Sequence, residues 1–264
     1  MAQPTPITPS ATRVAIVTGG AQGLGEVIAL RLADENVDVA VLDIPSKEQQ
    51  MLEVVEKIKA KGRRAISISA DVTDEQQVKA AIDQCVDKLG NLDIMIANAG
   101  ILHLGTILDT SVEQWDRVYD VNVRGLMLCY KHAAIQMIKQ GRGGRIIGAC
   151  SSSGKRGVPG MAAYSSSKFA VRGITQIAAQ EWGQYNISVN AYAPGFVATP
   201  MLAHEEDGKL GGYGEYLKKL TNMPPGYEFP EPTTVSELVA YLVKPDSYVL
   251  TGECVNLCGT WTFD

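Results

Sequence analysis

Residues Arg13-Val-Ala-Ile-Val-Thr-Gly-Gly-Ala-Gln-Gly-Leu-Gly25 decide the fold of this chain. The stretch begins as an apolar β-branched run, typical of a buried strand, and passes through a glycine-rich turn into a periodic apolar helix. Glycines let the backbone approach a pyrophosphate group closely, and a helix N-terminus offers unpaired N–H groups to its negative charge. The glycines at 19, 23 and 25 are spaced one residue wider than the usual dinucleotide turn. The turn alone therefore leaves a purely structural role open.

The rest of the chain alternates short β-branched runs with longer amphipathic stretches. We expect strands near residues 13–18, 37–43, 64–70, 92–97, 144–150, 187–193 and 253–258. We expect helices near residues 23–35, 46–61, 74–90, 111–140, 161–184 and 232–243. Thr73 and Gln76 have the spacing of a capping box and predict the start of the third helix. This alternation predicts a single-domain α/β Rossmann fold, with a seven-stranded parallel sheet and helices on both faces.

Two segments differ from this pattern. Residues 1–12 carry three prolines, and we expect a loose arm preceding a catalytic domain at 13–264. Residues 195–232 are rich in Gly, Pro and charged side chains and are too long for an ordinary connection, so we expect a substrate lid. Within it we expect a short helix at Tyr213–Leu220 and turns at Pro224, Pro225 and Gly226. An idle surface insertion is the alternative.

The composition is that of an ordinary globular protein. The 264 residues are 45% hydrophobic and 20% charged, and the net charge of −5 is spread without a block of like charges. We therefore expect no nucleic-acid partner and no membrane surface. The start of the chain has no apolar run of the length that a signal peptide or spanning helix needs.

The cysteines and histidines do not have the spacing of a metal site. The thiols are scattered singly through apolar stretches, at Cys85, Cys129, Cys150, Cys254 and Cys258. Such an odd, scattered set is typical of reduced, buried cysteines, so we expect a cytoplasmic protein. Cys254 and Cys258 have no second pair nearby to complete a tetrahedral site, and the histidines, His103, His132 and His204, lack ligand spacing. We predict no metal.

Asp43 strengthens the interpretation of the glycine turn. It ends the second predicted strand, some two dozen residues beyond Gly19. A carboxylate there can accept hydrogen bonds from both adenosine ribose hydroxyls and would repel a 2′-phosphate. Neither Gln22 nor Ile44 supplies a cation that would hold such a phosphate. We therefore expect NAD(H) rather than NADP(H), with a solvated loop carboxylate as the alternative.

Further polar groups follow the next two predicted strands. Asp71 and Val72 follow strand 64–70, and Asn98-Ala99-Gly100 follows strand 92–97. In an open parallel sheet, ligands bind outside the carboxyl ends of the strands. These residues are therefore expected to face the cofactor.

Tyr164 and Lys168 are four residues apart at the start of a predicted helix, so their side chains share one face. A free phenol has a pKa of roughly 10 and holds its proton too tightly for acid–base work near neutral pH. A neighbouring ammonium favours the phenolate, and we expect Lys168 to lower the pKa of Tyr164. Without further residues, such a pair would be an ordinary surface contact in most proteins.

Together these motifs resemble those of the classical short-chain dehydrogenases/reductases, from Arg13 to about Gly259. Thr18–Gly25 is similar to the family's T-G-x-x-x-G-x-G, Asn98–Gly100 to its N-A-G, and Tyr164–Lys168 to its Y-x-x-x-K. Ser151 stands at the family's usual interval, thirteen residues before Tyr164. One departure is Leu257-Cys258-Gly259, which replaces the family's usual D-G-G. It leaves the substrate shape and the assembly open.

The resemblance implies a division of labour among four catalytic residues. Ser151 would hydrogen-bond the substrate oxygen, and Tyr164 would give or take its proton. Lys168 would lower the tyrosine pKa and hold the nicotinamide ribose. Asn122 would anchor a water chain, with stabilisation of a helix kink as its structural alternative. The implied cofactor contacts are Gly19, Gln22, Gly23, Leu24, Gly25, Asp43, Ile44, Asp71, Val72, Asn98, Ala99, Gly100, Tyr164, Lys168, Pro194, Gly195, Val197 and Thr199.

The function we expect is NAD(H)-dependent interconversion of a secondary alcohol and a ketone. Within the family the closest likeness is to acetoin/diacetyl reductases, also called butanediol dehydrogenases. The bulky run Met223–Pro230 in the lid keeps a larger cyclic, aromatic or terpenoid alcohol open. A nucleotide-binding regulatory module is a third, weaker alternative. The resemblance also implies a homotetramer, through the long helices at 111–140 and 161–184.

Overall fold

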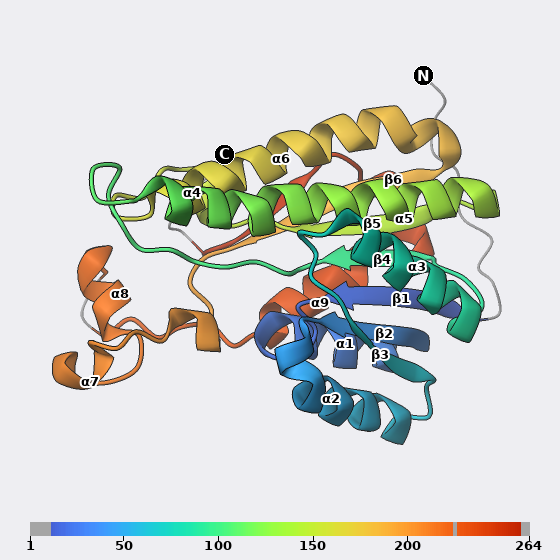
Figure 1. Ribbon diagram of the computed structural model, residues 1–264, viewed down its shortest axis with the longest axis horizontal. Helices are drawn as coiled ribbons and strands as arrows, with labels where there is room; N and C mark the ends of the chain where they lie inside the picture. Colours follow the sequence, from blue (N-terminus) through green and yellow to red (C-terminus); the bar gives the residue numbers. More distant parts are fainter. Residues whose placement is uncertain (1–11, 224–225, 260–264) are drawn as a thin grey trace.

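The computed structural model describes residues 12–223 and 226–259, so the predicted arm up to residue 11, the turn prolines Pro224 and Pro225 and the final five residues lie outside it. One parallel sheet runs through the described chain in the strand order β3-β2-β1-β4-β5-β6-β7 (Figure 1). Its strands are β1 Arg13–Thr18, β2 Val37–Asp43, β3 Ala65–Ser69, β4 Ile94–Ala97, β5 Gly144–Ala149, β6 Ile187–Pro194 and β7 Cys254–Leu257. The predicted seven-stranded parallel sheet is confirmed.

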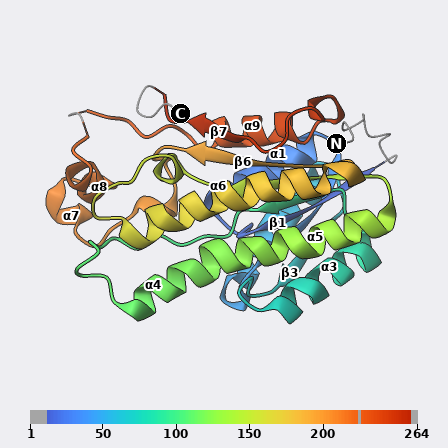
Figure 2. The same cartoon turned by 90° about the horizontal axis from the view of Figure 1, so that it is seen from above.

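Helices cover both faces of this sheet, as Figure 2 shows from above. The helices of one face are α1 Gly23–Asp34, α2 Glu48–Ala60 and α9 Thr233–Leu242. Those of the other are α3 Glu75–Leu89, α5 Leu126–Gln140 and α6 Ala162–Trp182, and α4 Val112–Tyr119 extends α5 beyond the sheet. Because both faces are covered, β1, β2 and β6 are buried almost throughout, which explains their continuous apolar runs.

The predicted helix at 111–140 is continuous but changes its winding in the middle. Asp120–Gly125 is π-helical, between α4 and α5. Such bulges are rare inside helices and often occur at functional sites. This one contains Asn122, which is buried.

The predicted capping box of the third helix is wrong. The Asp74 carboxylate caps α3 instead, accepting hydrogen bonds from the amides of Gln76 (2.9 Å) and Gln77 (3.1 Å). The Thr73 hydroxyl instead donates to Asp71 Oδ1 over 2.8 Å. A carboxylate one residue further along is the better acceptor for these amides. A complete capping box does occur at Ser111 and Gln114, where α4 begins.

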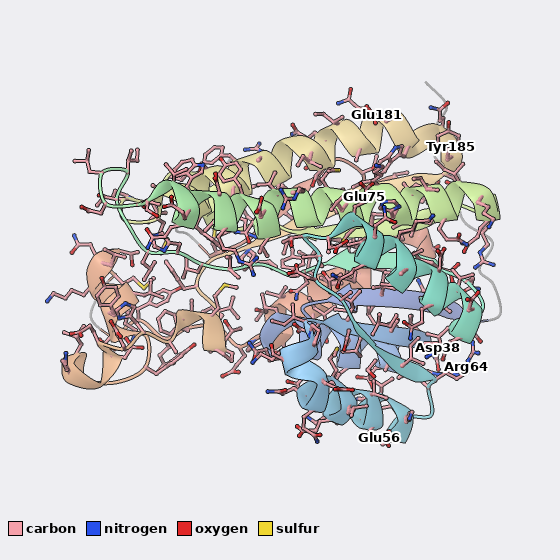
Figure 3. All side chains as sticks on the ribbon, viewed as in Figure 1. Asp38, Glu56, Arg64, Glu75, Glu181 and Tyr185 are labelled. Atoms are coloured by element: carbon pink, nitrogen blue, oxygen red, sulfur yellow. The ribbon has the colours of Figure 1, made fainter. Side chains whose placement is uncertain are left out.

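An ion pair between a buried carboxylate and an exposed arginine lies at the end of the sheet opposite the glycine turn. Asp38 on β2 is 1% exposed and accepts from Arg64 Nε over 2.7 Å and from the Arg64 amide over 3.0 Å. Arg63 Nε lies 3.4 Å from the same carboxylate. Figure 3 shows Asp38 and Arg64 side by side at the edge of β2 and β3. The contact holds the start of β3 against β2.

The segment at 195–232 contains two short helices beyond the carboxyl ends of the strands (Figure 1). The short helix expected at Tyr213–Leu220 is present as α8 Glu215–Leu220, whereas α7 Asp207–Leu210 was not anticipated. Single 3₁₀ turns complete the described chain, at Pro45–Lys47, Ser152–Gly154, Gly183–Tyr185, Pro200–Leu202 and Pro245–Ser247.

Four of the five cysteines are buried as the sequence predicts, namely Cys85, Cys129, Cys150 and Cys254, and Cys258 is partly exposed. Within residues 12–223 and 226–259, no three His, Cys, Asp or Glu side chains are grouped to hold a metal ion. Across the same ranges, none of the helices combines the length and apolar character needed to cross a membrane.

Candidate active site

The glycine turn between β1 and α1 is built so that side chains are excluded. Gly19 has φ +62°, and a Cβ there would lie only 3.0 Å from the Cα of Ala99. A Cβ on Gly25 would come within 2.0 Å of the Gly19 carbonyl oxygen. Gly25 therefore lets α1 pack against the turn, while Gly19 lets the backbone take a left-handed conformation. Both features fit a turn that cradles a pyrophosphate.

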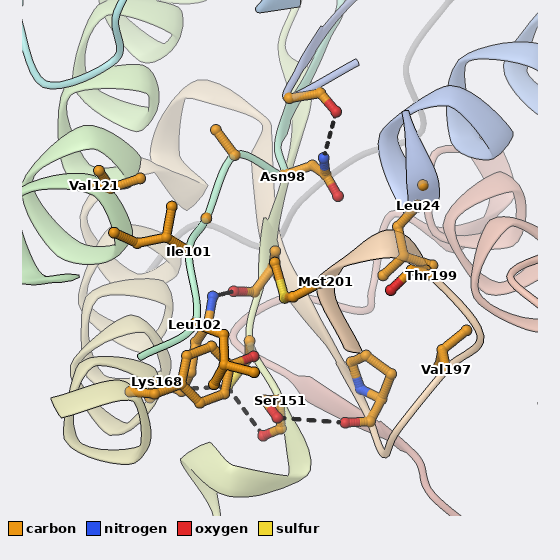
Figure 4. Close-up of a pocket in the computed structure, with 18 of the residues that line it drawn as sticks. Leu24, Asn98, Ile101, Leu102, Val121, Ser151, Lys168, Val197, Thr199 and Met201 are labelled. Atoms are coloured by element: carbon orange, nitrogen blue, oxygen red, sulfur yellow. Dashed lines mark hydrogen bonds between the residues drawn. The ribbon is translucent and has the colours of Figure 1, made fainter. Parts of the chain in front are cut away.

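One pocket at the carboxyl ends of the strands gathers most of the predicted cofactor residues. Figure 4 shows Asn98 and Leu24 at one end of it and Ser151 and Lys168 at the other. Every predicted cofactor residue except Gly25 lines this pocket, and so does Ser151. The lining also includes residues that the sequence did not single out, among them Ile101, Leu102, Arg117, Val121, Met161 and Tyr192.

Asp43 lines the pocket beside the glycine turn. Its carboxylate accepts from the Ala21 amide over 3.1 Å and from the Ile44 amide over 2.9 Å. The structure also places a cation nearby that the sequence argument did not consider, because Lys47 Nζ donates to Gln22 Oε1 over 3.0 Å. Gln22 and Ile44 carry no charge themselves, but the turn between β2 and α2 brings Lys47 to the same rim.

At the other end of the pocket, Ser151 and Tyr164 lie in hydrogen-bonding contact. Their hydroxyls share a hydrogen bond, and Ser151 Oγ also accepts from the Ser153 amide over 3.1 Å. Ser151 follows β5, and Tyr164 is in the first turn of α6. The two groups could hold one substrate oxygen between them, which is the geometry that stabilises charge developing on that oxygen.

Lys168 is 3% exposed and lies next to this pair. Its Nζ donates to the Ala149 carbonyl oxygen over 2.8 Å and is 5.4 Å from the centre of the Tyr164 ring. Burial lowers the pKa of Lys168 to about 8, because a charged ammonium is poorly solvated there.

The expected net decrease in the tyrosine pKa is wrong for the chain as the structure has it. Burial raises the pKa of Tyr164 to about 12, and the hydrogen bond from Ser151 opposes only part of that rise. Burial disfavours both the phenolate and the ammonium, and Lys168 Nζ is bonded to a carbonyl instead of the phenol oxygen. Tyr164 is accordingly a protonated phenol at neutral pH.

Asn122 lies behind the pocket and does not line it. Its Oδ1 accepts from the Ile101 amide over 2.8 Å, and its Nδ2 donates to the Ile101 carbonyl over 2.9 Å and to Ser167 Oγ over 3.1 Å. A Cβ on Gly100 would lie 3.3 Å from Asn122 Oδ1 and 3.5 Å from Lys168 Nζ. Asn122 thus links the loop after β4 to helix α6 by hydrogen bonds, close to Lys168.

Apart from Ser151 and Lys168, Tyr164 packs against an apolar cluster. A small hydrophobic cluster buries Met161, Leu202 and Leu217 and packs against Leu102, Leu104, Val158, Tyr164, Phe196 and Phe229. The charged residues that line the pocket are Asp43, Asp71, Arg117 and Lys168, and none of them belongs to this cluster. The reacting end can therefore accept an uncharged carbon skeleton.

Comparisons with known proteins agree with the motifs. A family model described as short chain dehydrogenase matches residues 13–210. A short-chain dehydrogenase/reductase of Armillaria gallica is 44% identical over 96% of this chain and 97% of its own length. L-2,3-butanediol dehydrogenase of Corynebacterium glutamicum is 37% identical over 94% and 97%.

A solved structure is similar over nearly the whole chain. The short-chain dehydrogenase from Mycobacterium paratuberculosis, bound to NAD, superposes with a TM-score of 0.84 at 31% identity, covering 93% of this chain and 96% of that one. These matches confirm the resemblance drawn from the glycine turn and the Tyr164–Lys168 motif. The chain belongs to the short-chain dehydrogenase/reductase family, whose members are oxidoreductases acting on alcohols and ketones.

Proposed function

We propose that this protein is an NAD(H)-dependent oxidoreductase that interconverts a secondary alcohol and a ketone by hydride transfer. The observation that carries the proposal is the Ser151–Tyr164 hydrogen bond beside the buried Lys168, in the pocket that also contains the glycine turn. The nicotinamide cofactor supplies or receives the hydride, and the chain supplies binding, orientation and the proton.

The proton step follows from the positions of the two hydroxyls. In ketone reduction, Ser151 and Tyr164 would donate hydrogen bonds to the carbonyl oxygen, and Tyr164 would release its proton to that oxygen as negative charge develops. Lys168 would hold the nicotinamide ribose and stabilise the resulting phenolate. Asn122 would support Lys168 through the loop at Ile101 and, as the resemblance implies, anchor the water that returns the proton.

The choice of NAD over NADP rests on Asp43. Its carboxylate, fixed by the Ala21 and Ile44 amides, is suited to the ribose hydroxyls and would repel a 2′-phosphate. Lys47 on the same rim is the group that would oppose this preference. The NAD bound to the mycobacterial relative supports the proposal.

The first substrate candidate is acetoin, diacetyl or butanediol. Its support is the similarity to the butanediol dehydrogenase of Corynebacterium glutamicum. Such a compound has two oxygens on four carbons, so it would need a second polar contact beyond Ser151 and Tyr164.

The second candidate is a larger cyclic, aromatic or terpenoid alcohol. The apolar cluster around Tyr164 favours it, because Leu102, Leu104 and Phe196 offer contact area and no hydrogen-bonding side chains. Phe229 of the predicted lid packs against the same cluster and lies 6.4 Å from Phe196, centre to centre.

The test is nicotinamide absorbance with purified protein and either NAD or NADP, across butanediol, acetoin, diacetyl, cyclic alcohols and terpenoid alcohols. We expect NAD to be preferred. Higher kcat/KM for the cyclic alcohols would select the second substrate candidate, and higher kcat/KM for acetoin would select the first. A preference for NADP would contradict the role given to Asp43. NADH binding without turnover of any alcohol would instead support a regulatory module.

We also propose a location, an assembly and domain bounds for the protein. Four buried cysteines outside any disulfide suit a reducing compartment, so we propose that the enzyme is cytoplasmic. We also propose a homotetramer, a catalytic domain at 13–264 and a lid at 195–232 that closes over the substrate.

A further inference from the structure

Tyr192 on β6 is a fully buried tyrosine that the sequence did not single out. Its relative exposure is 0%, and its hydroxyl donates to Asn98 Oδ1 over 2.7 Å, although 94 residues separate them. The paired residue on the neighbouring strand β5 is Ala149, whose small side chain leaves room for a phenol ring on that face. Tyr192 therefore reaches from β6 to the loop that follows β4.

The Asn98 side chain connects this hydroxyl to the glycine turn. Its Nδ2 donates to the carbonyl oxygens of Thr18 over 2.8 Å and Gly19 over 3.2 Å. A Cβ on Gly19 would lie 3.0 Å from this nitrogen, and one on Gly25 only 2.7 Å away. The amide of Asn98 thus packs directly against the turn, and any rotation of the amide would disturb both glycines.

An amide group has a donating and an accepting end, so its orientation is set by its partners. The two carbonyls select the Nδ2 end, and the Tyr192 hydroxyl satisfies the Oδ1 end. Burial raises the pKa of Tyr192 above its ordinary value, so the phenol stays protonated. Tyr192 is consequently a permanent donor to Asn98.

The backbone of Tyr192 contacts the reacting half of the site. Its carbonyl oxygen accepts from the Cys150 amide over 2.9 Å, next to Ser151. Pro194 and Gly195, which line the pocket, lie two and three residues further along the chain. One residue thus joins the strand behind Ser151 to the turn expected to hold the pyrophosphate.

We propose that Tyr192 is a positioning residue for cofactor binding, acting through Asn98 to hold the glycine turn in its binding conformation. This inference rests on the proposed nicotinamide cofactor. It differs from a role in core stability alone, because it requires that the loss of one hydroxyl weaken cofactor affinity in particular. A purely structural tyrosine would affect unfolding and leave affinity unchanged.

The chain offers a matched control in Tyr130 on α5. It is also fully buried, with 1% exposure, and its hydroxyl lies 3.1 Å from Thr175 Oγ1 and 3.4 Å from the Asn190 carbonyl oxygen. None of these partners lines the pocket. Tyr192→Phe and Tyr130→Phe each remove one buried hydroxyl and keep the ring.

The experiment measures the Kd of NADH and of NADPH by nucleotide fluorescence, together with kcat, KM and Tm, for the wild type and both variants. We expect Tyr192→Phe to raise the Kd of the preferred nucleotide about tenfold, the size of one lost buried hydrogen bond. The kcat of Tyr192→Phe at saturating cofactor should fall by less than this factor. Tyr130→Phe should lower Tm and leave the Kd within about twofold of the wild type.

Two results would overturn the inference. One is a Kd for Tyr192→Phe within about twofold of the wild-type value. The other is an equal rise in Kd for Tyr130→Phe, which would mean that any buried hydroxyl has this effect. A wild-type preference for NADPH would contradict the role of Asp43 instead, and the comparison of the two variants would then be made with NADPH.

Discussion

Tyr164 and Lys168 show at the scale of single residues what burial does to an acid–base pair. Burial raises the pKa of the phenol to about 12 and lowers that of the ammonium to about 8. Both shifts disfavour the charged form of each group. At neutral pH the pair is therefore a neutral phenol beside an ammonium that loses its proton more easily than a lysine in water. The phenol therefore keeps its proton at neutral pH, and in the proposed reaction it would release that proton only as negative charge develops on the substrate oxygen.

The lysine has a consequence for stability that can be measured. Its pKa is near 8 in the folded chain and near 10.5 in the unfolded one. Between these values the unfolded state binds more protons, so the wild type should gain stability as the pH rises through this window. Lys168→Met lacks this titration. We expect its free energy of unfolding, relative to the wild type, to fall by about 2 kcal/mol between pH 7 and pH 9.5.

Chemical denaturation of both proteins across this pH range is the measurement. The variant removes the hydrogen bond to Ala149 at every pH, so that loss shifts the difference between the two proteins by a constant amount. A difference that does not change with pH would contradict the burial argument for Lys168.

The sequence predicted those candidate site residues that carry a local signal in the chain. Tyr164 and Lys168 are one helical turn apart, and Asp43 follows a recognisable strand, so spacing was sufficient. Tyr192 and Lys47 were missed because their partners, Asn98 and Gln22, are contacts made only by the folded sheet. The direction of the tyrosine pKa was missed for a related reason, since burial is a property of the assembled pocket.

At the scale of elements, strands were predictable and helix details were not. Continuous β-branched runs such as those in β1 and β2 gave the correct bounds, because a sheet covered on both faces buries every residue. The π-helical stretch Asp120–Gly125 has no local signal distinguishing it from the helices on either side. Thr73 and the adjacent Asp74 could both have capped α3. Asp74 is the N-cap, because its carboxylate is a stronger acceptor than a hydroxyl.

Asp207 organises the predicted lid. Its carboxylate is 7% exposed and accepts from the amides of His204 (2.9 Å), Gly214 (2.9 Å) and Tyr216 (3.0 Å). These hydrogen bonds hold the pKa of Asp207 below its ordinary value, and the bond from the Tyr216 amide has the largest effect. The support that Asp207 gives the lid should therefore be present above the ordinary carboxyl pKa and lost as the pH falls through the depressed one.

Removing this carboxylate should loosen the lid while sparing the cofactor turn. We expect Asp207→Ala to raise KM for the best alcohol substrate about tenfold, since three amides lose their acceptor. The Kd of NADH should stay unchanged. Steady-state kinetics and cofactor titration measure the two quantities. Glu206→Ala is the control, because the neighbouring Glu206 carboxylate forms an ion pair with Lys209 on the surface of the same segment. An unchanged KM in Asp207→Ala would contradict the proposal that residues 195–232 act as a substrate lid.

At the scale of the whole molecule, the outer faces of α5 and α6 carry exposed apolar side chains. They include Ile135 at 54%, Phe169 at 45% and Ile177 at 58% exposure. Helices α5 and α6 contact each other, so these exposed apolar side chains suit an interaction site on the two helices. They fit the proposed contact between copies of this chain, with these two helices packed against their symmetry mates.

We expect light scattering at micromolar concentration to give the mass of four chains. Ile177→Glu should break the assembly by burying a charge in the contact, and Tyr185→Glu, a change at an exposed site beyond the end of α6, should not. A wild-type monomer at that concentration would contradict the tetramer.

The central claim is that Tyr164 passes the proton while the cofactor passes the hydride. Tyr164→Phe keeps the ring and removes only the hydroxyl, so it tests this claim most directly. The measurement is nicotinamide absorbance under saturating cofactor, with NADH affinity determined on the same preparation. We predict that kcat/KM falls by roughly a thousandfold while the Kd of NADH changes by less than about twofold. Turnover in the variant close to that of the wild type would contradict the account.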